Sequence, residues 1–128
     1  MESKLILVLE RSGLVAADIE ETIKETYPTT RVLQAGSIES GEKIALSNDR
    51  IDLAIVSSFT DQLPQSTLMR HLEASSTALA ISAAADADMS AFGSAYRLPT
   101  PFTSCAIRHL LEKVSRADAA DAGPSDPP

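Results

Sequence analysis

Cysteine is almost absent from this sequence, and tryptophan is entirely absent. The single Cys105 excludes an internal disulfide and leaves no second thiolate for a metal site, so we expect a reducing, cytoplasmic compartment. The first residues lack the basic stretch, apolar core and small-residue cleavage site of a signal peptide. No apolar run approaches the roughly 20 residues that span a bilayer. We therefore expect a cytoplasmic protein that does not cross a membrane.

Positive charge is also scarce. The chain has 11 Lys and Arg against 18 Asp and Glu, which gives a formal net charge of -7, and only 4% of its residues are aromatic. Such a surface repels phosphate backbones and anionic lipids, and it offers few rings on which bases could stack. We expect neither nucleic-acid nor membrane binding. The 128 residues suit one domain with a core of its own.

The most informative stretch is residues 51–56, an almost wholly apolar run that is followed by Ser57 and Ser58. It lacks the alternation of a half-solvated strand, so we predict a strand that is buried on both faces. In open parallel sheets, ligands collect beyond the carboxyl ends of the central strands. The two serines therefore mark the place where a functional site is expected.

Strand and helix patterns alternate along the chain. Four further strands are predicted at residues 5–9, 30–35, 78–82 and 95–98, where Pro99 indicates an edge strand. Helices are predicted at residues 14–26, after the cap Ser37, at 66–74, at 86–92 with Gly93 as a left-handed C-cap, and after the cap Thr103. Short right-handed crossovers between parallel strands then predict an α/β fold, a flavodoxin-like doubly wound five-stranded parallel sheet of order 2-1-3-4-5 with five helices.

Two helices have clear apolar stripes. The stripe of the first helix consists of Leu14, Val15, Ile19 and Ile23, and that of the last helix consists of Ile107, Leu110, Leu111 and Val114. Residues 117–128 hold three aspartates and little that a core could bury, so we predict a folded domain over residues 1–116 and a disordered acidic tail over 117–128.

Four segments carry a resemblance to the receiver domain of two-component response regulators, over about Lys4 to Val114. They are Ile6-Leu7-Val8-Leu9-Glu10-Arg11, Asp52-Leu53-Ala54-Ile55-Val56-Ser57, Ala80-Ile81-Ser82-Ala83 and Leu98-Pro99-Thr100-Pro101-Phe102. Each falls where that family keeps the end of a strand. The resemblance implies a signalling module that binds protein partners.

The family's phosphoacceptor pocket is degenerate here. Receivers end the first strand with two adjacent acids that hold Mg²⁺, whereas Glu10 is followed by Arg11. Ser57 stands at the position of the phosphorylated aspartate, and Thr100 at that of the lysine. Only the Ser/Thr of the fourth strand is kept, as Ser82, so the chain resembles a pseudo-receiver.

Phosphoryl transfer needs a nucleophile, a divalent cation and a fixed positive charge. One carboxylate beside a guanidinium is a poor Mg²⁺ site, and no histidine at a strand end could activate Ser57. We predict no enzymatic activity, no cofactor and no metal. Arg11 is either solvated or turned into the vacated metal site, where it would pair with Glu10 or Asp61 and hold the pocket in one state. Capping of backbone groups is the plainer interpretation of Ser57 and Ser58, and their modification stays open.

Two candidate interfaces follow from the resemblance. The surface of the fourth helix, fifth strand and last helix would present Tyr96, Arg97, Arg108 and Glu112. The first helix presents an acidic face that includes Asp18 and Glu21. The implied partners are a histidine kinase, a phosphotransfer protein, another regulator or a second copy of the chain.

Two functions are therefore predicted as alternatives. The first is a non-enzymatic module that acts by protein–protein interaction in a two-component or phosphorelay pathway, independently of aspartyl phosphorylation. The second is a small-molecule-binding flavodoxin-like domain, in which the serines and Thr100 line a polar cleft. Phosphate-cradling glycines would favour the second, and the strand ends offer only Gly13 and Gly36.

Overall fold

The structure is a computed structural model that describes residues 4–83, 87–99 and 102–122, with side chains as far as residue 117. One parallel sheet is formed by β1 (Leu5–Leu9), β2 (Arg31–Ala35), β3 (Leu53–Val56), β4 (Ala78–Ser82) and β5 (Tyr96–Leu98). Its order is β2-β1-β3-β4-β5, which confirms the predicted topology. β5 lies at an edge of the sheet, as the following Pro99 indicated.

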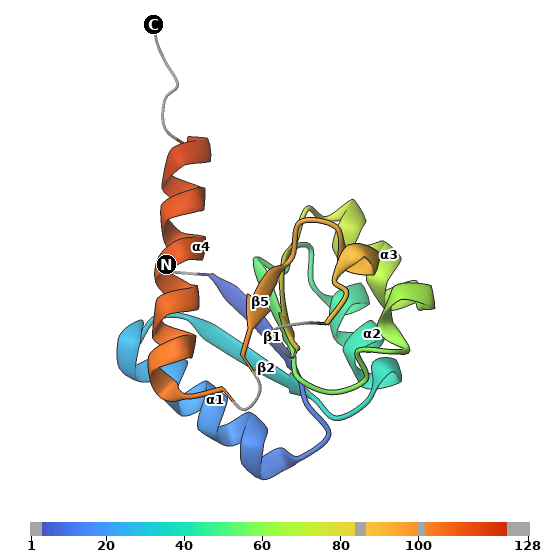
Figure 1. Ribbon diagram of the computed structural model, residues 1–128, viewed down its shortest axis with the longest axis horizontal. Coiled ribbons are helices and arrows are strands. Elements are labelled where there is room, and N and C mark those ends of the chain that lie inside the picture. Colours follow the sequence, from blue (N-terminus) through green and yellow to red (C-terminus); the bar gives the residue numbers. More distant parts are fainter. Residues whose placement is uncertain (1–3, 84–86, 100–101, 123–128) are drawn as a thin grey trace, which may run out of the picture.

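Helices cover both faces of the sheet (Figure 1). α1 (Gly13–Thr26) and α4 (Ser104–Ala122) lie on one face, and α2 (Ile38–Ser47) and α3 (Thr67–Ala74) on the other. Two single 3₁₀ turns, η1 (Leu63–Gln65) and η2 (Ser90–Phe92), complete the regular structure of the described residues. This arrangement is the predicted flavodoxin-like, doubly wound fold.

The predicted fifth helix is wrong, since the described residues form four α-helices. Residues 87–89 are irregular and only Ser90–Phe92 makes a helical turn, while residues 84–86 lie outside the described ranges. The Asp88 carboxylate accepts a hydrogen bond from the amide of Ser90 at 2.9 Å, a local bond that competes with helix formation. Gly93 follows with φ 63° and ψ -123°, a positive φ that suits glycine but lies outside the left-handed helical region that we predicted.

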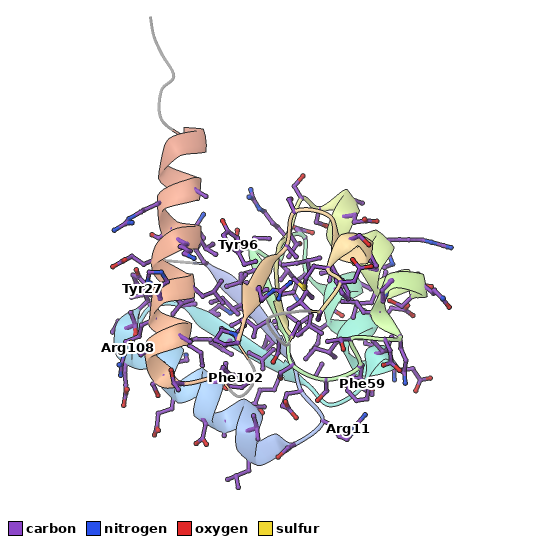
Figure 2. All side chains as sticks on the ribbon, viewed as in Figure 1. Arg11, Tyr27, Phe59, Tyr96, Phe102 and Arg108 are labelled. Atoms are coloured by element: carbon purple, nitrogen blue, oxygen red, sulfur yellow. The ribbon has the colours of Figure 1, made fainter. Side chains whose placement is uncertain are left out.

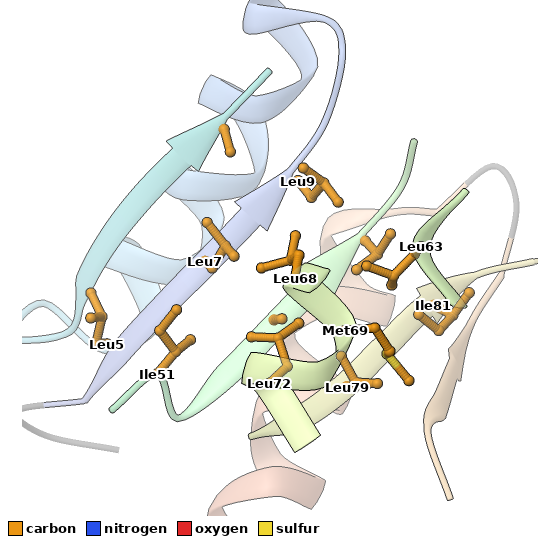
Figure 3. Close-up of a cluster of buried hydrophobic side chains, with 13 residues drawn as sticks. Leu5, Leu7, Leu9, Ile51, Leu63, Leu68, Met69, Leu72, Leu79 and Ile81 are labelled. Carbon is orange, nitrogen blue, oxygen red and sulfur yellow. The ribbon is translucent and has the colours of Figure 1, made fainter. Parts of the chain in front are cut away.

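The sheet separates two apolar clusters, which explains why β1 and β3 lack alternation. In β1, Leu5, Leu7 and Leu9 face α3 (Figure 3) and also belong to the cluster against which α2 packs, whereas Ile6 and Val8 face α1 and α4. All nine residues of β1 and β3 are buried. The prediction of a central strand that is buried on both faces is therefore confirmed.

The apolar stripe of α1 differs from the predicted one at Leu14, whose side chain is 77% exposed. The buried residues are Ala16, Ile19, Thr22 and Ile23. Leu14 lies two residues before Ala16, which is about 200° around a helix of 3.6 residues per turn, so it points away from the sheet. Val15 is partly buried against the same cluster.

α4 begins and packs as predicted but ends later. The Thr103 hydroxyl accepts a hydrogen bond from the amide of Ala106 at 3.1 Å, as an N-cap does. Ile107, Leu110, Leu111 and Val114 are buried. The helix continues past the predicted domain boundary at residue 116 to Ala122 and projects beyond the sheet (Figure 1), because its last turns are rich in alanine. Residues 123–128 lie outside the described chain, and for them a disordered tail stays a prediction.

α2 packs unusually closely against its neighbours at Gly41. A methyl group at that position would lie 2.9 Å from Cδ2 of Leu68 on α3 and 3.5 Å from Cδ1 of Leu9 on β1. Both leucines are fully buried. Gly41 therefore sets the distance between α2 and the layer beneath it.

Across residues 4–83, 87–99 and 102–122, no helix combines the length and the apolar character that crossing a bilayer requires.

Candidate functional site

The candidate site lies at the carboxyl ends of three adjacent strands. Glu10 follows β1, Ser57 and Ser58 follow β3, and Ser82 ends β4. The parallel register aligns Leu9 with Val56, so the residues that follow these two come together. Glu10 retains only 9% of its accessible surface, which makes it a buried carboxylate. The structure thus brings Glu10 and Ser57 together.

Three hydrogen bonds hold the carboxylate of Glu10. The Ser57 hydroxyl donates to Oε1 at 2.5 Å, the Ser58 hydroxyl donates to Oε2 at 3.1 Å, and the backbone amide of Ser12 donates to Oε2 at 2.7 Å. The amides of Ser57 and Ser58 also donate to the carbonyl of Leu9, at 3.0 and 3.3 Å. The serines therefore do more than cap the end of β3, because they satisfy a charge from β1.

Ser12 has two roles in this arrangement, and neither was predicted. Its hydroxyl accepts a hydrogen bond from the amide of Val15 at 3.3 Å and so caps α1, while its own amide binds Glu10. A serine just before a helix is a recognised N-cap signal. That signal was available, whereas the bond to Glu10 depends on the turn between β1 and α1.

The environment of Glu10 keeps it ionised. Burial raises the pKa of this carboxyl, but the hydrogen bonds from Ser12, Ser57 and Ser58, together with the charge of Arg11, more than offset burial and lower the pKa below its ordinary value. A charge-assisted hydrogen bond is stronger than a neutral one, which favours the deprotonated acid. The site therefore presents a negative charge at neutral pH.

Glu10 makes stability depend on pH in the acid range. Its lowered pKa means that the unfolded chain takes up a proton first, so the stabilisation is complete above the unfolded pKa of about 4.3 and is lost as pH falls through the folded value. We expect Glu10→Gln to be less stable than wild type at pH 7 by about 2 kcal/mol, with a smaller difference below pH 4.

Urea unfolding at several pH values measures this difference. Glu20→Gln is the matched control, because Glu20 lies on α1 away from the strand ends and accepts a hydrogen bond from the Gln34 side chain. A difference between wild type and Glu10→Gln that stayed constant down to pH 3 would contradict the lowered pKa.

Arg11 does not enter the pocket. Its guanidinium lies over the ring of Phe59, 4.7 Å from the centroid (Figure 2), and within the described residues it makes no ion pair with Glu10 or Asp61. The predicted pairing is therefore not formed, and a cation–π contact replaces it.

Phe59 has a backbone conformation that the sequence could not have indicated. Its φ is 64°, in the left-handed region that bulky residues rarely adopt. The carbonyl of Phe59 accepts the amides of Gln62 and Leu63 at 3.1 and 3.0 Å, which closes a tight turn after β3. This turn presents the ring to Arg11, so the loops after β1 and β3 contact each other beside Glu10.

A groove of about 640 Å³ opens on the other side of Glu10, between α1 and the start of α4. We call it the α1–α4 groove. The residues that line it are Glu10, Val15, Asp18, Ile19, Glu21, Thr22, Ser57, Ser82, Phe102, Thr103, Ser104 and Ile107. Ser82 thus shares a groove with Glu10 and Ser57, whereas Thr100 lies outside the described residues.

The residues present do not fit a magnesium ion of the receiver type. Hard divalent cations take six or more oxygen ligands, usually with several carboxylates. Both oxygens of Glu10 already accept hydrogen bonds, and the part of the chain that the structure describes holds no group of three or more His, Cys, Asp or Glu side chains that could bind a metal.

The predicted interface residues do not form one surface. Tyr96 is half-buried on β5, and Arg97 next to it donates to the carbonyl of Ala87 at 2.8 Å. Arg108 lies on the other side of α4, where its guanidinium is 3.7 Å from Glu25 of α1 (Figure 2). Glu112 pairs within α4 with Arg116 at 3.3 Å.

The acidic residues of α1 occupy a different surface from those of β5 and α4. Asp18 and Glu21 are exposed and line the α1–α4 groove. The charge of these two residues therefore lies beside the site at the strand ends.

Comparisons by sequence give no family, since no family model matches the chain and no curated protein matches it. Solved structures do match. The chain is similar to a response regulator receiver domain protein from Clostridium thermocellum, at 18% identity and a TM-score of 0.73, over 91% of this chain and 98% of that one.

Two further solved structures give the same result. The signal receiver domain of an HD domain-containing protein from Pseudomonas fluorescens Pf-5 is 16% identical with a TM-score of 0.70, over 95% of this chain and 93% of that one. The chemotaxis response regulator CheY4 of Vibrio cholerae is 13% identical with a TM-score of 0.68, over 87% of this chain and 98% of that one. At these identities the likeness shows a shared fold, and the structural neighbours are response regulator receiver domains.

Proposed function

We propose that this chain is a pseudo-receiver, a non-enzymatic signalling module that binds a protein partner without using aspartyl phosphate. The partner would be a histidine kinase, a phosphotransfer protein, another regulator of a two-component or phosphorelay pathway, or a second copy of the chain. The receiver fold supports the signalling role, and the single cysteine supports a cytoplasmic location.

The state of Glu10 is the observation that carries the proposal. A receiver that accepts phosphate needs carboxylates that are free to hold a cation and an aspartate that attacks phosphorus. Here the one buried carboxylate at the strand ends accepts three hydrogen bonds, and the hydroxyl closest to it belongs to Ser57. These bonds join the ends of β1 and β3 in a single arrangement that needs no phosphoryl group.

The acidic side of α1 favours a basic partner surface. Asp18 and Glu21 are exposed on one side of the helix, and the whole chain has a net charge of -7. Charge complementarity of this kind raises association rates and falls off with salt. Arg97 on β5 is the alternative contact point.

Phosphoryl analogues provide the direct test. We expect Mg²⁺ and beryllofluoride, alone or together, to leave the melting temperature of the chain unchanged, because a ligand stabilises a fold only if it binds the folded state. Thermal unfolding by circular dichroism measures this, with a receiver that has the acidic pair as the positive control. A rise of several degrees that required both additives would refute the proposal.

A second function, the binding of a small molecule, has its own supporting observation. The α1–α4 groove has the size of a small-molecule site and combines apolar walls with a few polar groups, as such sites do.

A further inference from the structure

The inner end of the α1–α4 groove is formed by a charged and buried carboxylate. Glu10 lines the groove and retains 9% of its accessible surface. Its three hydrogen bonds come from neutral donors, two hydroxyls and one amide. A carboxylate offers about four lone-pair sites. One further donor can therefore approach Glu10 from the groove.

Arg11 acts on this charge only from beyond ion-pair distance. Within the part of the chain that the structure describes, Glu10 forms no ion pair within 4.0 Å, and the residues that line the groove include no Lys, Arg or His. The two nearby guanidinium groups point elsewhere, since Arg11 lies over Phe59 and Arg108 is 3.7 Å from Glu25. A buried charge without a counter-ion is costly. A cation in the groove would therefore supply the close counter-ion that Glu10 does not have among the described residues.

The rest of the groove has two distinct parts. Asp18 and Glu21 add negative charge from the exposed side of α1. Apolar side chains from both helices and from the segment before α4 line the walls: Val15, Ile19, Phe102 and Ile107. A ligand that matches these parts has a positive head group and an apolar body.

We propose that the α1–α4 groove binds a small organic cation, a molecule with one ammonium group and an apolar chain or ring. The ammonium group would donate to Glu10 at the inner end, and the apolar part would lie against Ile19 and Phe102. The groove of about 640 Å³ is within the range of small-molecule sites, about 300–1,000 Å³. This inference rests on the second function proposed above, the binding of a small molecule in this groove.

An ammonium group suits this site better than a metal ion does. A divalent metal needs several oxygen ligands in a defined geometry, whereas Glu10 is the only buried carboxylate among the described residues that line the groove. An ammonium group carries three donors, which match one carboxylate oxygen and neighbouring hydroxyl oxygens. Ser57, whose hydroxyl donates to Glu10, lines the same groove.

Isothermal titration calorimetry with hexylammonium chloride tests the proposal, with sodium hexanoate and methylammonium chloride as comparison ligands. We expect saturable binding of hexylammonium at physiological ionic strength, weaker binding of methylammonium and none of hexanoate. Glu10→Gln is expected to weaken hexylammonium binding at least about tenfold, because it removes a charge-assisted hydrogen bond. Glu20→Gln makes the same charge change outside the groove and should leave the affinity within about twofold.

Phe102→Ala is the second variant, and it keeps the test valid if Glu10→Gln does not fold. It should weaken hexylammonium binding several-fold without changing that of methylammonium, since only the longer cation contacts the ring. Thermal melts check that each variant is folded. The proposal is overturned if wild type shows no saturable binding, or if Glu10→Gln and Glu20→Gln lower the affinity equally. Either result leaves the phosphoryl-analogue test of the signalling role unaffected.

Discussion

Ser57→Asp is expected to destabilise the chain by about 3 kcal/mol at pH 7, although it restores the residue type that active receivers have at this position. The Ser57 hydroxyl donates to Glu10 at 2.5 Å. An aspartate there removes the donor and brings a second negative charge to a buried carboxylate. A large loss of stability is therefore expected from the substitution that restores the residue type of active receivers.

The pH dependence of this variant has a definite sign. Two adjacent carboxylates raise the pKa of one of them above its unfolded value of about 3.9, so the penalty is full above the raised folded value. It decreases as pH falls and disappears below the unfolded value, where both states bind the proton. Chemical denaturation of Ser57→Asp and wild type between pH 7 and 3.5 measures the change.

Ser57→Asn is the control that separates charge from shape. It has nearly the size of aspartate and retains a donor for Glu10, so we expect it to cost about 1 kcal/mol. Mg²⁺ should stabilise Ser57→Asp, which has two adjacent carboxylates, and leave wild type and Ser57→Asn unchanged. Equal destabilisation by Asp and Asn would show that the charge of Glu10 does not dominate this site.

Gly41→Val is expected to destabilise the chain by about 3 kcal/mol for a purely steric reason. Even a Cβ atom at this position would lie 2.9 Å from Leu68, and the extra methyl groups of valine would meet Leu9 as well. Both leucines are fully buried and cannot move without disturbing the core. Overpacking of this kind costs about 1–3 kcal/mol.

A graded series tests the steric explanation. Gly41→Ala should lose about 1 kcal/mol, because the end of the Leu68 side chain can shift slightly, and Gly41→Val should lose more. Gly36→Val is the matched control, since a Cβ at Gly36 would have nothing within 4 Å. Urea denaturation compares the three. If Gly36→Val lost as much stability as Gly41→Val, close packing of α2 would not be the cause.

The sequence predicts most of this fold because its apolar pattern is strong. The run at residues 51–56 predicted a central strand buried on both faces, and β3 is one. The spacing of Ile107, Leu110, Leu111 and Val114 predicted the buried side of α4. A spacing of apolar residues that repeats over several turns or strands reflects which side chains are buried, and the hydrophobic effect stabilises the fold by burying them.

The differences arise where a local contact outweighs the pattern. The segment before Gly93 has enough alanine to predict a helix, but Asp88 binds the amide of Ser90 instead. Leu14 was assigned to the apolar stripe of α1 because it is apolar, but its side chain is exposed on the side of the helix that faces away from the sheet. A glycine in the middle of a helix, such as Gly41, lowers helix propensity. In the structure, the absence of a side chain at Gly41 allows α2 to pack closely against Leu68 and Leu9.

The site could be located but not described from sequence. The end of the central strand pointed to Ser57 and Ser58, because ligands collect at that edge of a parallel sheet, and the resemblance to receivers added Glu10. Whether a charged side chain turns inward or outward depends on competing contacts. The Arg11 side chain turns outward because it contacts the ring of Phe59, and the position of that ring depends on the φ angle of 64° at Phe59.

The bond between Glu10 and Ser57 also has a consequence for the order of folding events. The two residues are 47 positions apart, and β1 lies between β2, which follows it in the chain, and β3, which follows only after α2. Such non-local pairing forms slowly, because closing a long loop costs entropy before any contact between the strands stabilises it. During synthesis or refolding, β1 and β2 can pair first and leave Glu10 in water. Its charge is buried only when β3 docks, so amide exchange at Ser57 would report the moment at which the site is completed.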